Sequence, residues 1–180
     1  AYRSLHCSLL DRTESPKHTN LSFEFANQAL KLAEEHSIIY AHYPRDYVRA
    51  YWLLGSAYRA NNELTLAEEN LSKALNLCRQ INLVTEEAEI LLDLARLSFD
   101  YGLSSSAQDR LQYFKDAQEK ASEALVITER SGYVLQGADV NLFLAQYTLE
   151  QEQDKNKAKQ FAEAAKKLAH CDDGPPYYYK

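Results

Sequence analysis

Glycine, proline, cysteine and tryptophan are scarce in this sequence, and methionine is absent. The 180 residues include 5 glycines, 4 prolines, 3 cysteines and 1 tryptophan. A protein built from strands and tight turns needs more glycine and proline than this, whereas helices joined by short turns need little of either. The composition therefore favours an all-α protein.

The cysteines and histidines do not form a pattern that binds a metal. Cys7, Cys78 and Cys171 are odd in number and far apart, so they indicate neither a disulfide framework nor a zinc site. The 5 histidines are never spaced four residues apart, so no helical face offers two ligands one turn apart. We therefore expect neither a metal nor any other cofactor. Because the cysteines indicate no disulfide framework, we also expect a cytoplasmic location.

Long apolar runs are also missing. No run approaches the roughly 20 residues that cross a bilayer, and the first residues lack the apolar core of a signal peptide. The formal net charge of -6 argues against binding to nucleic acid or to an anionic membrane, which both attract positive surfaces. Because the chain lacks methionine and ends abruptly at Lys180, we expect it to be a segment of a longer protein.

Small residues recur at regular positions. Four segments carry alanines seven residues apart, beginning at Ala26, Ala67, Ala117 and Ala158. A second series of small residues consists of Gly55, Ala95 and Ala145, and a leucine precedes each of them. Each member lies 28 or 29 residues after the first alanine of the preceding segment. Two interleaved helix types at a constant offset predict repeated helical hairpins, because small residues let paired helices approach closely.

The predicted fold has eight helices, near residues 1–10, 20–36, 44–61, 64–81, 85–102, 106–131, 134–152 and 155–170. They form about four antiparallel hairpins in a single domain over residues 1–180; the hairpins cover residues 1–36, 44–81, 85–131 and 134–170, and the tail covers 171–180. We expect Ala67, Ala74, Ala95 and Ala145 to be buried where helices cross.

Turn-forming residues mark the expected helix boundaries. Pro44 suits a first helical turn, Asn61-Asn62 a turn, and Gly102 and Gly132 helix exits. Helical spacing continues across residues 104–114, so we expect these residues to extend the following helix rather than form a loop.

One segment resembles a known repeat family. Leu54-Gly55-Ser56-Ala57-Tyr58, followed by Ala67, Leu71 and Ala74, is similar to the tetratricopeptide repeat signature. Trp52 lies one residue from the signature's tryptophan position, and Arg79 replaces the usual final proline. The resemblance implies a right-handed α-solenoid whose concave face binds a partner.

A narrower resemblance covers roughly the last quarter of the chain. Residues 131–142 and the Gly174-Pro175-Pro176 tail are similar to the C-terminal tetratricopeptide region of bacterial STAND/NACHT-type signalling NTPases. In such proteins an NTPase switch precedes repeats that act as the sensor or interaction surface. The phosphate-binding G-x-x-x-x-G-K-[S/T] loop is absent from these residues, so any NTPase module would lie elsewhere in the parent chain.

The candidate binding surface begins on the helix predicted at 44–61. Arg49, Trp52, Ser56 and Arg59 are spaced three or four residues apart, which places them on one helical stripe. Tryptophan beside arginines suits an extended peptide or a carboxylate-bearing ligand. The alternative is that Trp52 is half-buried against the next hairpin. Tyr51 and Tyr58, at signature positions, are expected to pack between helices.

The corresponding positions on later helices complete this predicted concave face. They are Glu89, Leu92, Arg96 and Phe99, then Asp139, Leu142, Gln146 and Leu149. Gln136 also matches the narrower family, although a residue at a helix start can simply cap or solvate it.

The acidic runs are the only residues that could suggest catalysis. The acidic groups Glu34-Glu35, Glu68-Glu69 and Glu86-Glu87-Glu89 resemble solvated helix faces more than acid/base pairs, because nothing specifies a cleft that shifts their pKa values. We therefore expect no catalytic residues and no enzyme activity.

The predicted function is a non-catalytic scaffold that binds a protein or peptide segment, as the sensor of a larger signalling NTPase. We also expect this region to contact an NTPase module of the parent chain. Two alternatives stay open: a small-ligand sensor pocket, and a structural arm that self-associates weakly through exposed repeat ends.

Overall fold

The computed structural model describes residues 16–39 and 44–170, and the side chains of residues 21–35 and 44–170. Within these ranges every regular element is helical, which confirms the all-α prediction. The predicted helix at 1–10 and the tail at 171–180 lie outside the described residues. None of the described helices is long and apolar enough to span a membrane.

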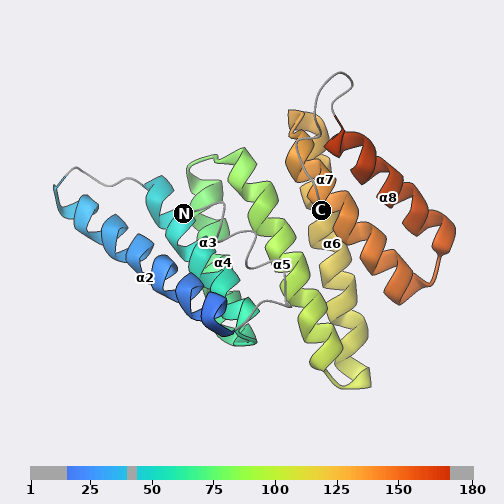
Figure 1. The fold of residues 1–180 in the computed structure, drawn as a ribbon, viewed down its shortest axis with the longest axis horizontal. Helices are drawn as coiled ribbons and strands as arrows, with labels where there is room; N and C mark the ends of the chain where they lie inside the picture. The colour runs from blue at the N-terminus through green and yellow to red at the C-terminus, as the bar shows by residue number, and fades with distance from the viewer. Residues whose placement is uncertain (1–15, 40–43, 171–180) are drawn as a thin grey trace. The chain divides into compact units, whose positions relative to one another are not determined.

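The chain divides into two compact units, residues 1–83 and 84–180. In the first unit, α3 (Pro44–Ala60) packs against both α2 (Pro16–Ile39) and α4 (Leu64–Gln80). Helices that are adjacent in sequence are thus adjacent in space, as the hairpin pattern predicted (Figure 1).

The second unit contains α5 (Val84–Ser104), α6 (Ala107–Ser131), α7 (Val134–Tyr147) and α8 (Lys155–Ala169). Each of these helices packs against the next, and α5 also contacts α7. A π-helical turn, η1 (Thr148–Glu152), extends α7. The α5–α7 contact joins two helices that are not consecutive in the sequence.

Most predicted boundaries are confirmed, and their causes are visible. α3 begins at Pro44, whose fixed φ suits the first helical turn. Asn62 adopts a φ of 63° in the turn after α3, and Gly132 ends α6 in the left-handed conformation with a φ of 68°. Asp154 caps α8 by accepting hydrogen bonds from the backbone N–H groups of Asn156 and Lys157, both at 3.0 Å.

The prediction that Gly102 ends a helix is wrong. α5 continues to Ser104, and Gly102 is buried inside it against the ring of Phe114 on α6. A Cβ atom at position 102 would overlap that ring. Glycine here allows two helices to approach closely, and the helix ends instead where Ser104 Oγ donates to the carbonyl of Asp100, at 2.8 Å.

The segment at 104–114 is helical from Ala107 onward, as predicted. Only residues 105 and 106 separate α5 from α6. The predicted helix at 134–152 also runs its full length, although its last five residues have π-helical hydrogen bonding.

The alanine series lies where helices meet. Ala67, Ala74, Ala95 and Ala145 are all buried, which confirms the prediction. Gly55 shows why small residues are needed, since a Cβ atom there would lie 2.6 Å from Cγ of Leu71 on α4.

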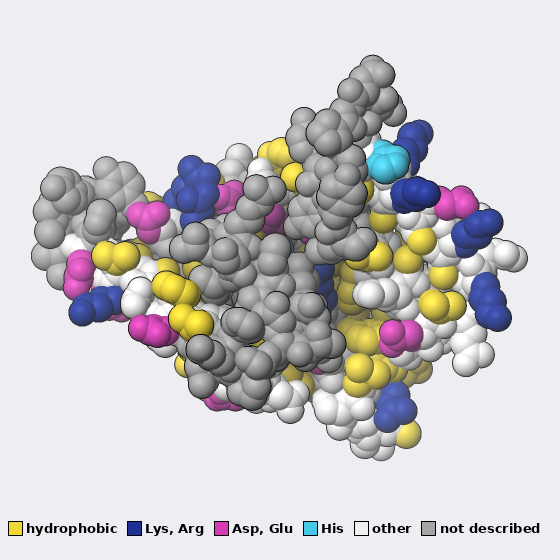
Figure 2. Space-filling model, viewed as in Figure 1, with side chains coloured by type: hydrophobic (Ala, Val, Ile, Leu, Met, Phe, Trp, Pro, Cys, Tyr) yellow, Lys and Arg dark blue, Asp and Glu magenta, His cyan; other side chains and the backbone are white. Residues whose placement is uncertain are grey.

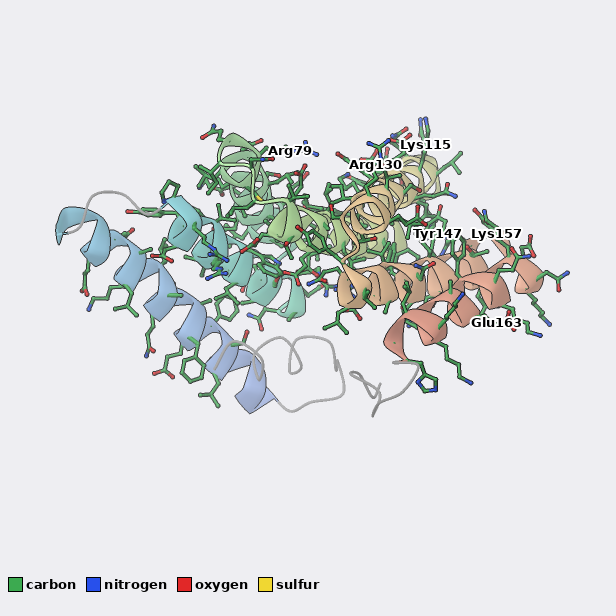
Figure 3. The ribbon with its side chains drawn as sticks, turned by 90° about the horizontal axis from the view of Figure 1, so that it is seen from above. Arg79, Lys115, Arg130, Tyr147, Lys157 and Glu163 are labelled. Carbon is green, nitrogen blue, oxygen red and sulfur yellow. The ribbon has the colours of Figure 1, made fainter. Side chains whose placement is uncertain are left out.

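Aromatic side chains fill the interior of the second unit. Phe99 of α5 lies with its ring centroid 5.4 Å from that of Phe114 and 6.1 Å from those of Phe143 and Tyr147. In Figure 3, Tyr147 lies within the unit, whereas Lys115 and Arg130 of α6 lie on its outer side. One aromatic cluster therefore joins α5, α6 and α7 within the second unit.

Candidate functional site

The predicted stripe on α3 is largely enclosed. Trp52 is 3% exposed and Ser56 is 7% exposed, while Arg49 and Arg59 are half-buried. Buried side chains of this kind stabilise the first unit whether or not they also contact a ligand. The binding role of these four residues stays a prediction.

The tyrosines at the signature positions of α3 pack between helices. Tyr58 meets Phe23 of α2 edge to face, with ring centroids 4.9 Å apart. Tyr51 faces α4, where the Lys73 ammonium lies 5.7 Å from its ring centroid. The predicted packing role of both tyrosines is confirmed, so the aromatic richness of α3 does not by itself indicate a ligand.

The second unit brings predicted residues of two different helices together. Glu89 lies on α5 and Gln136 on α7, and the Gln136 side chain donates an N–H to Glu89, with 3.0 Å between Nε2 and Oε1. Gln136 therefore neither caps α7 nor extends into solvent, which corrects the capping interpretation. Its amide instead fixes the α5–α7 contact.

Other carboxylates gather around this hydrogen bond. Glu86 and Asp93, one turn before and after Glu89 on α5, are 8% and 4% exposed, and Asp139 follows Gln136 by three residues on α7. We call Glu86, Glu89, Asp93, Arg96, Gln136 and Asp139 the α5–α7 polar cluster. The interpretation of Glu86 as part of a solvated face is wrong, and so is the expectation that the surroundings of Glu89 leave its pKa unshifted. Glu34, Glu35, Glu68 and Glu69 are exposed as expected.

Arg96 is the cation of the α5–α7 polar cluster. Its Nη1 lies 2.9 Å from Oδ1 of Asp93, and the two side chains are 15% and 6% exposed. A pair this enclosed is held by a charge-assisted hydrogen bond rather than by weak surface attraction. Arg96 therefore neutralises Asp93 and is less available for a ligand's carboxylate than the sequence suggested.

Glu89 has an unusual acidity. Burial raises its pKa from an ordinary 4.5 to about 7, because a carboxylate loses hydration away from water. The hydrogen bond from Gln136 opposes this shift, while the charges of Asp93, Glu86 and Asp139 add to it. Near neutral pH, Glu89 consequently exchanges between a charged acceptor and a neutral carboxylic acid.

The remaining predicted residues have different surroundings. Phe99 is half-buried, and its ring contacts those of Phe114, Phe143 and Tyr147. Leu142, one turn after Asp139 on α7, is 36% exposed. The α5–α7 polar cluster thus has an apolar side chain at its edge.

Three residues of the α5–α7 polar cluster were absent from the predicted binding face: Glu86, Asp93 and Gln136. A signal for the first two exists in the sequence, because Glu86, Glu89 and Asp93 share one helical stripe at spacings of three and four. The partner stripe on α7 gave no comparable signal, since only one of its residues there is charged.

Among the residues whose side chains are described, no three His, Cys, Asp or Glu groups gather as metal ligands would. Carboxylates with one neighbouring arginine favour a cationic group through charge-assisted hydrogen bonds. Comparison with protein-family models, curated proteins and solved structures gave no significant match.

Proposed function

We propose that the chain is a non-catalytic helical scaffold of the tetratricopeptide type that binds a protein or peptide segment through the face formed by α5 and α7. The sequential helix pairs and the small residues between them support this repeat interpretation. The resemblance of the last quarter to signalling NTPases supports a role as the sensor region of a larger cytoplasmic protein.

The observation that carries the proposal is the hydrogen bond between Glu89 and Gln136 within the α5–α7 polar cluster. Enclosed carboxylates cost folding free energy, and apolar residues at the same positions would pack more favourably. Charged groups that are buried despite this cost in folding free energy, one of them with a strongly shifted pKa, are typical of functional sites.

The charge of the α5–α7 polar cluster indicates the chemistry of the bound segment. Of the six residues that define the α5–α7 polar cluster, four are acidic, and Arg96 pairs with one of them, Asp93. Leu142 adds apolar surface beside Asp139. A segment that carries a lysine or arginine next to a large apolar side chain fits this face better than the acidic ligand that the arginines of the sequence suggested.

Selection from a random peptide library against the intact chain tests the proposal. The selected peptides should be enriched in lysine or arginine beside leucine, isoleucine or phenylalanine. Asp139→Asn should weaken their binding by about tenfold or more, as expected at a central interface position. Glu129→Gln, which removes an exposed charge from α6 of the same unit, is the matched control and should leave the affinity unchanged.

Two results would contradict the proposal. Selected peptides without basic residues would exclude the predicted chemistry, and equal affinities for wild type, Asp139→Asn and Glu129→Gln would exclude the α5–α7 face.

A further inference from the structure

An exposed apolar stripe runs along α2, separate from the face that α2 packs against α3. Leu21, Phe25 and Leu32 are 38%, 40% and 55% exposed. At 100° per residue they fall within an arc of about 40° on one side of the helix. The buried residues Ala26 and Ala33 lie on a different side.

Figure 2 shows hydrophobic side chains following one another along α2, with acidic and basic side chains beside them. A helix that is apolar on two sides is typical of a helix that packs against two neighbours. Among the described elements, α2 packs against α3. The stripe on its other side is therefore suited to a second helix.

We propose that this stripe pairs with the same stripe of a second copy of the chain, as two antiparallel α2 helices related by a two-fold axis. The register follows from the spacing of the side chains. An axis between residues 26 and 27 places Leu21 opposite Leu32 of the second copy and Phe25 opposite Gln28 of the second copy.

Charge complementarity supports the second copy as the occupant. Glu24 and Lys31 lie on the same edge of the stripe, seven residues apart. In an antiparallel pair of helices, like edges meet, so Glu24 and Lys31 of the second copy lie on facing edges, offset by two residues or about 3 Å along the axis, which the lysine side chain can span. The two-fold axis repeats this contact. Within one chain, Lys31 pairs only loosely with Glu35, at 3.8 Å with both side chains more than half exposed, so it can turn to a new partner.

The pairing is expected to be weak. A stripe of three large side chains is small beside the roughly 1,600 Å² of a standard stable interface, and smaller interfaces are typical of transient association. The contact lies entirely on α2 and does not depend on the peptide-binding face proposed for α5 and α7.

Sedimentation of the intact chain from about 10 μM to about 1 mM, the range of weak complexes, tests the inference. We expect a dimer that forms as the concentration rises. Leu32→Glu should raise its dissociation constant at least tenfold, whereas Leu111→Glu, at a leucine of α6 that is 77% exposed, should not change it. Circular dichroism should give equal helix content for both variants.

A charge exchange tests the register itself. Glu24→Lys and Lys31→Glu should each weaken the dimer several-fold by placing like charges opposite each other, and the double variant should restore it. A chain that stays monomeric throughout this range, with α2 occupied by another segment or not at all, would overturn the inference. A dimer that tolerates Leu32→Glu, or a double variant that fails to restore association, would overturn it equally.

Discussion

Gln136 of α7 donates its side-chain N–H to the carboxylate of Glu89 on α5, across 3.0 Å and 47 residues of sequence. Around it lie three further carboxylates, from Glu86, Asp93 and Asp139, whose charges make ionisation of Glu89 less favourable. The contact between the two helices is consequently sensitive to the protonation of one side chain.

This sensitivity predicts how stability changes with pH. The pKa of Glu89 is about 7 in the folded state and near 4.5 without its surroundings, so between these values the folded chain holds a proton that the unfolded chain releases. The stabilisation linked to that proton is fully present below pH 4.5 and is lost as the pH rises through 7. Its size is on the order of 2 to 3 kcal/mol.

Glu89→Gln should remove this pH dependence. Glutamine keeps an oxygen that accepts the hydrogen bond from Gln136 and carries no charge. Urea unfolding near pH 5 and near pH 8 should show that wild type loses stability at the higher pH relative to Glu89→Gln. Glu129→Gln serves as the control, because it removes an exposed charge. An identical change with pH in wild type and Glu89→Gln would contradict the account.

Enlarging a buried alanine should destabilise the second unit. Ala95 has no exposed surface, so Ala95→Leu must displace its neighbours at a cost of roughly 1 to 3 kcal/mol. Ala162 is exposed on α8, and Ala162→Leu should change the free energy of unfolding by less than about 0.5 kcal/mol. Thermal unfolding of the two variants compares them directly, and equal melting temperatures would show that the helix register is wrong.

The C-terminal end of α6 depends on the backbone conformation of Gly132. Its φ of 68° is in the left-handed region, and no atom lies near a Cβ built there, so the conformation alone opposes a side chain. Gly132→Ala should lower the free energy of unfolding by about 1 kcal/mol, and Gly132→Asn by less, because asparagine tolerates this region better. Denaturant titration measures both, and a neutral Gly132→Ala would contradict the capping role.

Phe99 should behave as a core residue rather than as a ligand contact. Its ring touches three others, so Phe99→Ala should lower the free energy of unfolding by about 3 kcal/mol. Phe99→Leu, which keeps most of the volume, should lose less stability and bind a selected peptide as wild type does. If Phe99→Leu is fully stable but loses peptide binding, the side chain belongs to the binding surface after all.

The helices could be predicted from the sequence because their signals are local. Alanines recur at helical spacing, Pro44 restricts its own φ, and Asn62 and Gly132 tolerate the left-handed conformation that their turns require. Gly102 was misinterpreted because a glycine that ends a helix and a glycine that admits a neighbouring ring look the same in a sequence. Only the position of Phe114, twelve residues later on another helix, distinguishes them.

The candidate site was harder to predict because it depends on contacts between helices that are far apart in the sequence. Glu86 and Asp93 have the spacing of a solvated helix face, yet both are buried in the folded chain. Gln136, some 50 residues after Glu86 in sequence, donates its hydrogen bond to Glu89 only once both helices are placed. Trp52 presents the converse case, since a side chain expected on an open face is enclosed.

Hydrogen–deuterium exchange of the intact chain, with and without a saturating selected peptide, tests the central claim most directly. If the face formed by α5 and α7 binds the segment, the peptide should slow exchange in both helices, around residues 86–100 and 136–146. The outer helices α6 and α8 should change little. Protection confined to other helices, or none despite saturation, would contradict the account.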